Sequence, residues 1–317
     1  MLDANAPDET LQRGLALLSQ WLHRATGERA FILVDEYDTP IHAAFQHGYC
    51  DEAVGLFRNL FSGAFKDNAS LHRGVMTGIL RIAKESIFSG LNNLEVYSIL
   101  RPEFSSHFGF TPAEVGTLAA ECGVTDRMPD IERWYNGYRF GGQTIYNPWS
   151  VLSFLSSLDH LPRPYWLHTG SDDILRELLV EGGKVDGADL EALLTGGVIQ
   201  KAIDEHLVLR EVRSSSASIW SFLLFSGYLR ADAQVGEDAL GRPLWALTLP
   251  NHEVRLAYRS LFAGFLDRGL GGDDRTTLLC RALLAGDIAA FEQHLESLLV
   301  ATLSHHDLGG RLPEAVY

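Results

Sequence analysis

Apolar residues recur along the chain with two different periodicities, and each predicts a different kind of element. Helical spacing runs through residues 8–25, and helical patterns also cover residues 50–66, 252–268 and 275–302. An uninterrupted apolar run, residues 31–34, is typical of a strand that is buried on both faces of a parallel sheet. The chain therefore begins with the pattern of an α/β unit.

Two further strand patterns follow this run, at residues 72–79 and 94–99. Together with residues 31–34 they predict the strands of an α/β core. The second strand ends in Thr77-Gly78, so a polar side chain is expected at its carboxyl end. Ligands of open α/β sheets bind at the carboxyl ends of the strands, which makes these ends the candidate site.

Three acids, Asp35, Glu36 and Asp38, come directly after the first strand. An apolar strand followed by Asp-Glu is the Walker B pattern of nucleotide hydrolases, in which the Asp helps to hold Mg²⁺ and the Glu polarises the attacking water. The alternative is a buried strand that ends in a solvated acidic turn. Adjacent acids on an extended strand point to opposite sides, so one of Asp35 and Glu36 is expected to face a site. Asp38 precedes Thr-Pro and is predicted to be a turn acceptor.

The middle of the chain changes character near residue 101. Thr111, Pro112 and Glu114 form a helix start, with a Thr cap, Pro in the first turn and Glu three residues after the cap. Short helical patterns broken by Gly and Pro continue to about residue 200, and Gly141-Gly142 predicts a turn between two short extended pieces.

The pattern changes again over residues 218–250. Residues 219–225 predict a strongly apolar helix, Gly227 begins a strand, residues 236–241 predict a loop and residues 244–249 a returning strand. A helix followed by a hairpin is compatible with a winged-helix module.

Several stretches resemble AAA-ATPase-like proteins that often carry a C-terminal PD-(D/E)XK nuclease domain. They are residues 35–41 (Asp-Glu-Tyr-Asp-Thr-Pro-Ile), 77–94, 134–140, 146–150 and 250–255. They occur in the family's order from about residue 30 to the end of the chain, which makes the resemblance specific.

The resemblance implies an α/β fold with a partial P-loop-type, AAA-like parallel sheet core in residues 1–105. A helical lid would follow in residues 106–205, and a winged-helix-like α+β region with C-terminal helices in residues 206–317. Residues 134–140 would belong to the lid, and Arg139 among them could be a sensor arginine. The ligands of the family are Mg²⁺ and ATP.

The resemblance also suggests the site residues. Asp35 would bind the metal and the nucleotide, while Glu36, Thr77 and Arg81 would be catalytic. Thr77 would orient water or the γ-phosphate, and the alternative is a Thr that satisfies backbone groups at a strand end. Arg81 has a fork of donors suited to phosphate, and the alternative is a surface ion pair.

Two motifs are missing from the sequence. A P-loop needs Gly-x-x-x-x-Gly-Lys-Ser/Thr, but around Gly183-Lys184 the first Gly is replaced by Leu178 and the Ser/Thr by Val185. A PD-(D/E)XK core needs an acid two residues before a Lys, and no Lys of the chain has one. The chain thus resembles the part of the family after the P-loop and before the nuclease core, and we expect a truncated form.

Composition narrows the function classes further. The net charge of −15 argues against indiscriminate DNA binding, although a local basic patch stays possible. Cys50, Cys122 and Cys280 form no Cys-x-x-Cys pair and are expected to be reduced thiols. Because no signal peptide or long apolar span is evident, a cytoplasmic protein without a membrane partner is expected.

Two functions of different class follow from these observations. The first is an AAA-ATPase-like module that couples ATP binding and hydrolysis to an effector such as a nuclease and is inactive as this truncated chain. The second is a non-catalytic scaffold on a degenerate ATPase core, which binds protein or nucleic acid. In both, nucleotide binding is expected to be weak or absent without a P-loop, and self-association is expected from the incomplete sheet.

Overall fold

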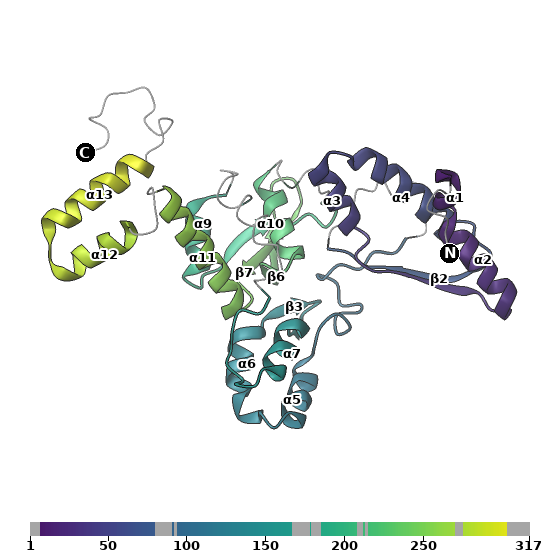
Figure 1. Cartoon of the computed structure of the whole chain (residues 1–317), viewed down its shortest axis with the longest axis horizontal. Helices are drawn as coiled ribbons and strands as arrows, with labels where there is room; N and C mark the ends of the chain where they lie inside the picture. The colour runs from purple at the N-terminus through teal and green to yellow at the C-terminus, as the bar shows by residue number, and fades with distance from the viewer. Residues whose placement is uncertain are drawn as a thin grey trace.

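The computed structural model describes residues 7–79, 91, 94–166, 178, 185–207, 212, 215–269 and 275–302. In chain order its elements are α1 Asp8–Gln12, α2 Gly14–Thr26, β1 Ala30–Val34, α3 Thr39–His47, α4 Cys50–Phe65, β2 Leu71–Met76, α5 Pro112–Glu121, the 3₁₀ helix η1 Thr125–Arg127, α6 Met128–Tyr135, β3 Tyr138–Phe140, β4 Gln143–Ile145, α7 Pro148–Ser156, α9 Gly187–Leu194, β5 Ile199–Ala202, α10 Ser216–Phe225, β6 Arg230–Glu237, β7 Pro243–Thr248, α11 His252–Gly269, α12 Arg275–Ala285 and α13 Ile288–Thr302. Elements α1–α4, β1 and β2 lie at one end of the long axis, and α12 and α13 lie at the other (Figure 1).

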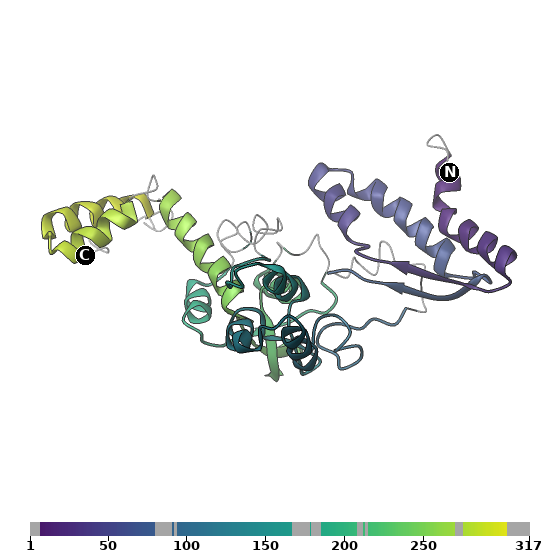
Figure 2. The ribbon, with the colours of Figure 1, turned by 60° about the horizontal axis from the view of Figure 1, so that its bottom comes forward.

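The N-terminal unit is built on two parallel strands, whose register pairs Ile32 with Gly74 and Val34 with Met76. Helices α2 and α4 cover one face of the pair (Figure 2). Ile32 points to these helices and is buried in the same hydrophobic cluster as Phe65 of α4. Gly74 makes this packing possible, because a Cβ at this position would stand 2.4 Å from a carbon of the Phe65 ring.

The other face of the same sheet carries apolar side chains that remain open to solvent. Phe31 is 63% exposed, Leu33 73% and Val75 44%. Side chains alternate between the two faces of a strand, so these three residues lie opposite Ile32. The sequence-based prediction of parallel strands is confirmed. The prediction that residues 31–34 are buried on both faces is wrong for the described part of the chain, where helices cover one face (Figure 2).

The predicted third strand at residues 94–99 is absent from the structure, where this segment pairs with no strand. Its polar groups bond elsewhere: the Ile99 carbonyl accepts from the Gly141 N–H at 2.8 Å. The Ser98 hydroxyl donates to a carboxylate oxygen of Glu205 at 2.5 Å. The segment therefore connects the N-terminal unit to the central elements and does not widen the β1–β2 sheet.

Two predicted helices are each divided in two. The pattern over residues 8–25 breaks at Arg13, which ends α1 and precedes α2. The pattern over residues 275–302 breaks at Gly286, whose φ of 67° ends α12 in a left-handed conformation. The side chain of Asp287 then accepts from the Ala290 N–H at 3.1 Å and caps the first turn of α13. The apolar periodicity alone does not predict this break at Gly286-Asp287.

A small helical unit follows, formed by α5, η1, α6 and α7 around a second buried cluster. Its first helix begins as predicted: the side chain of Thr111 accepts from the Glu114 N–H, and the Glu114 carboxylate accepts from the Thr111 N–H. The predicted turn is also confirmed, since Gly141 and Gly142, both with positive φ, join β3 to β4.

The central sheet has three antiparallel strands in the order β5-β7-β6. Helix α10 precedes the β6–β7 hairpin and contributes Ile219, Trp220 and Leu223 to the central buried cluster. The predicted apolar helix and returning strand are confirmed, although the first strand of the hairpin begins at Arg230, three residues later than expected.

Three stretches that are distant in sequence meet beside this sheet, at a fully buried carboxylate. Glu253, in the first turn of α11, accepts from the Ser150 hydroxyl of α7 at 2.8 Å and from the Trp166 N–H at 2.6 Å. Gly137 touches the same region so closely that a Cβ there would lie 1.8 Å from the Pro250 carbonyl oxygen. The predicted motif stretches 134–140, 146–150 and 250–255 therefore form one contact region.

Burial raises the pKa of Glu253 to about 7 from its ordinary value of 4.5, and the bonds from Trp166 and Ser150 oppose this rise only partly. Because the pKa is higher in the folded state, the folded protein keeps a proton that the unfolded chain has already lost. The contribution of this residue to stability is thus complete below about pH 4.5 and decreases as the pH rises through 7.

The variant Glu253→Gln removes this titration. Its free energy of unfolding should therefore rise relative to that of the wild type as the pH increases from 4.5 to 7. The relative change should be of the order of 3 kcal/mol, the free energy that corresponds to the pKa difference. Urea unfolding at several pH values measures it. Glu121→Gln, at an exposed position of α5, controls for loss of a charge. A pH-independent difference between Glu253→Gln and wild type would contradict the assignment.

Candidate functional site

The candidate site lies where β1 and β2 end, because both strands run in the same direction and finish side by side. Two backbone bonds continue the pairing past the strands: the Thr77 N–H donates to the Val34 carbonyl at 2.9 Å, and the Tyr37 N–H donates to the Thr77 carbonyl at 3.0 Å. These bonds fix the loop after β1 against the loop after β2. The polar residues that follow the two strands are therefore brought together.

Thr77 and Asp35, two of the predicted site residues, are in direct contact. The Thr77 hydroxyl donates to Oδ1 of Asp35. The N–H of Glu36 lies 3.1 Å from the same carboxylate oxygen and 3.3 Å from the Thr77 hydroxyl oxygen. Since these bonds use Oδ1, Oδ2 of the exposed Asp35 side chain is available as a ligand oxygen.

Glu36 has a backbone conformation that the sequence did not predict. Its φ of 49° is in the left-handed region, which is unusual for a residue with a side chain. The Glu36 carboxylate lies beside Thr39, whose hydroxyl donates to Oε2 at 3.4 Å. The alternation argument for Asp35 and Glu36 therefore does not apply, because both residues lie in the turn after the strand.

Asp38 is buried, with 2% of its surface exposed, and it joins the two loops. Its Oδ2 accepts from the Ile79 N–H at 2.9 Å. Gly78 leaves room for this contact, because a Cβ there would lie 2.7 Å from Oδ1 of Asp38 and 2.7 Å from the Tyr37 ring. Asp38 thus accepts a hydrogen bond from the loop after β2, whereas the sequence predicted that it would accept within its own turn.

Arg139, the predicted sensor arginine, lies away from this group. Arg81 is outside the described residues. Arg139 pairs with Asp232 of β6, at 3.7 Å between Nη1 and Oδ1, and β3 lies beside the central sheet (Figure 1). Sequence reasoning did not identify Thr39 as a partner of Glu36. The signal for it was the hydroxyl three residues after an acid in a turn.

The residues at the ends of β1 and β2 fit part of a Mg²⁺ site. Across the described residues, no three His, Cys, Asp or Glu side chains gather closely enough to form a metal cage. Mg²⁺ in nucleotide sites uses one or two protein carboxylates and takes its other ligands from water and phosphate oxygens. Asp35 with the adjacent Thr77 hydroxyl fits that pattern of ligands. The chain offers no Gly-x-x-x-x-Gly-Lys-Ser/Thr loop to hold the phosphates.

Comparison with known proteins places this site inside a recognised sequence family. Residues 2–88, which contain Asp35, Glu36 and Thr77, match the family described as "Predicted AAA-ATPase". The N-terminal part of the chain is therefore similar in sequence to an AAA-ATPase-like domain. No solved structure matches the chain. Where the structure describes it, no helix is both long and apolar enough to cross a membrane.

A longer relative matches most of the chain. It is described as "Uncharacterized protein in vnfD 5'region" of Azotobacter chroococcum mcd 1, and it is 31% identical over 287 residues. The match covers 89% of this chain and 52% of the relative. The chain thus spans about half the length of this curated relative.

The bond between Thr77 and Asp35 can be tested by Thr77→Val, which keeps the shape of the side chain and removes its hydroxyl. The variant should lose about 1 kcal/mol of unfolding free energy, the usual net contribution of one hydrogen bond. Thr144→Val is the matched control, because Thr144 is equally half-buried and no hydrogen bond of its side chain is found among the described residues. Equal urea unfolding curves for the two variants would contradict the Thr77–Asp35 bond.

Proposed function

We propose that the ends of β1 and β2 form the metal-binding and water-binding half of an AAA-type ATPase site. The observation that carries this proposal is the contact of Thr77 with Asp35 at the carboxyl ends of two adjacent parallel strands. Such ends are where open α/β sheets bind their ligands. The match of residues 2–88 to an ATPase family supports the same assignment.

Each side chain has a role in this proposal. Asp35 would hold Mg²⁺ through Oδ2, and Thr77 orients that carboxylate. Bound Mg²⁺ and ATP would supply the phosphoryl group and neutralise its developing charge. Glu36 would polarise the attacking water, since its carboxylate is exposed and is held by one long bond of 3.4 Å from Thr39. Arg81, four residues after Thr77, is proposed to contact phosphate.

The Gly-x-x-x-x-Gly-Lys-Ser/Thr loop that would form the second half of such a site, the phosphate cradle, does not occur in this sequence. We therefore infer that productive ATP binding needs phosphate-binding groups from outside this sequence. Coupling of hydrolysis to an effector such as a nuclease also belongs to the proposal, and no Asp/Glu-x-Lys motif for such chemistry occurs in the chain.

The chain alone should bind Mg-ATP weakly, because backbone N–H groups of a P-loop and its Lys supply most contacts to the phosphates. Titration calorimetry should find no site tighter than about 1 mM, which corresponds to about −4 kcal/mol. Binding in the micromolar range would show that the phosphates are held by residues outside the proposed site.

Glu36→Gln tests the catalytic role in a longer polypeptide where a P-loop segment precedes residue 1. The change keeps the size of the side chain and removes the charge that polarises water. Nucleotide affinity should stay nearly constant while turnover falls by about 10²–10⁴-fold, the usual effect of losing a positioned base. Glu52→Gln, at an exposed position of α4, should leave turnover unchanged. Full turnover in Glu36→Gln would remove Glu36 from the site.

A scaffold function is the second candidate, and two observations favour it. The strand order β5-β7-β6, with α10 before the hairpin, resembles a winged-helix arrangement. A DNA-reading helix presents polar side chains to the major groove, whereas α10 carries no basic residue and its central residues 219–224 are buried. The scaffold would therefore bind protein, and the exposed Phe31, Leu33 and Val75 offer a surface for a partner or a second copy.

A further inference from the structure

Basic side chains gather on α11 and α6, although the chain as a whole carries a net charge of −15. His252, Arg255 and Arg259 occupy positions i, i+3 and i+7 of α11, so they lie on one face of this helix. Helix α6, which contacts α11, contributes Arg133. These four residues form the basic surface. Figure 1 shows α11 on the side of the central sheet away from β1 and β2, so this surface is separate from the proposed ATPase site.

Two contacts hold the basic surface in place. The ring of Trp134, next to Arg133, meets the His252 ring edge to face, with 4.5 Å between their centroids. The half-buried Arg255 side chain rests against the turn after α9, because a Cβ at Gly196 would lie 3.7 Å from each of the two Nη atoms. The guanidinium is thus positioned before a ligand arrives, which lowers the entropy cost of binding.

No acid neutralises the three arginines in the described part of the chain. None of Arg133, Arg255 and Arg259 has an ion pair or a side-chain hydrogen bond there. The Nε of Arg255 is buried without a partner, whereas its two Nη atoms remain accessible. Arg242 of the β6–β7 hairpin, by contrast, pairs with Asp238 at 2.6 Å. The basic surface therefore carries positive charge that the fold leaves unbalanced.

His252 responds to this charge. Burial lowers the pKa of His252 below its ordinary value of 6.5, and the three arginines lower it further. No carboxylate of the described residues raises it. The adjacent Glu253 is buried and accepts its hydrogen bonds from α7 and from the Trp166 N–H. The missing partner of the surface is consequently an anion.

The chemistry and length of the surface favour the phosphates of a nucleic acid as this anion. Guanidinium groups match phosphate oxygens with paired N–H donors. From His252 to Arg259 the stripe on α11 is about 10 Å long, and one strand of a duplex places about three phosphates along such a length. The partly exposed Trp134 ring stands beside the stripe. Cationic surfaces with adjacent aromatic rings are typical of proteins that bind single strands, because bases stack on the rings.

We propose that the basic surface binds the phosphate backbone of a single-stranded nucleic acid without reading its sequence. The three arginines contact successive phosphates, and the Trp134 ring offers a face for one base. Helix α10 takes no part, since its central residues are buried. Because the surface is separate from β1 and β2, this binding does not depend on the proposed ATPase chemistry.

Fluorescence anisotropy of a labelled oligo-dT of twelve nucleotides, titrated with the full chain, tests the proposal. The Kd should be about 10–100 μM at low salt, within the range of sequence-independent binding. The logarithm of the affinity should fall with the logarithm of the salt concentration with a slope of about −2, because each of three neutralised phosphates contributes about −0.7.

Two variants assign the binding to the basic surface. Arg255→Gln and Arg259→Gln should each weaken binding by about 10-fold and make the salt slope less steep by about 0.7, because one phosphate contact is lost. Arg259 is exposed, so its substitution should leave the fold intact. Arg24→Gln, at an exposed position of α2, removes the same charge at a distant place and should change the affinity by less than about 2-fold.

A competing peptide of twelve glutamates separates nucleic acid from an acidic protein segment as the ligand. Weaker binding of the peptide than of oligo-dT supports the proposal, and equal or tighter binding of the peptide overturns it. The proposal is also overturned if oligo-dT shows no saturable binding below about 1 mM. The same holds if Arg259→Gln binds oligo-dT as tightly as Arg24→Gln does.

Discussion

Parallel pairing of β1 with β2 is the constraint on which the candidate site depends. The register sets Val34 beside Met76, so the next residues of both strands, Asp35 and Thr77, emerge together at one edge. An antiparallel pair would put these ends at opposite edges, and a shift of one residue would turn the side chains to the other face. Packing of Phe65 against Gly74 holds this register from the helical side.

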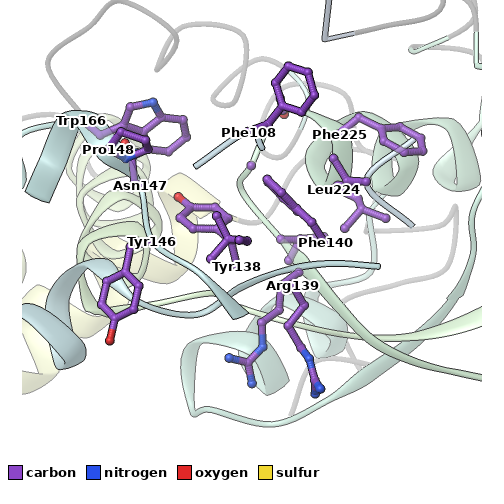
Figure 3. A pocket seen from close by; sticks show the side chains of 16 residues that line it. Phe108, Tyr138, Arg139, Phe140, Tyr146, Asn147, Pro148, Trp166, Leu224 and Phe225 are labelled. Carbon is purple, nitrogen blue, oxygen red and sulfur yellow. The ribbon is translucent and has the colours of Figure 1, made fainter. Parts of the chain in front are cut away.

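The central elements depend on a different constraint, a carboxylate kept out of water. Glu253 joins α7, Trp166 and α11 through two bonds, and Gly137 fits against Pro250 only because it has no side chain. This contact region holds the start of α7 and the segment at Trp166 in place, and both line a cavity of about 190 Å³ between β3, α7 and α10 (Figure 3). The motif stretches 134–140, 146–150 and 250–255, which resemble turn signals in the sequence, therefore together hold the walls of this cavity in place.

Local chemistry explains which features the sequence could predict. The Thr111–Glu114 cap, the Gly141-Gly142 turn and the strand-end position of Asp35 and Thr77 each depend on a few neighbouring residues. The left-handed turn at Glu36 and the exposure of Leu33 depend on contacts between distant segments. Periodicity shows that a strand is apolar, but it does not show whether helices cover one face of the sheet or both faces. The cavity was unpredictable for the same reason, since its walls come from several stretches.

We propose that Asp35 is the metal-binding residue of an ATPase half-site. The most direct test is the Mg²⁺ dependence of ATP turnover by Asp35→Asn, in a longer polypeptide that supplies a P-loop before residue 1. The Mg²⁺ concentration for half-maximal turnover should rise by at least about 10-fold, because a ligand charge is lost and changes even outside the first ligand shell have effects of that size. A Mg²⁺ dependence identical to that of the unsubstituted polypeptide would contradict the account.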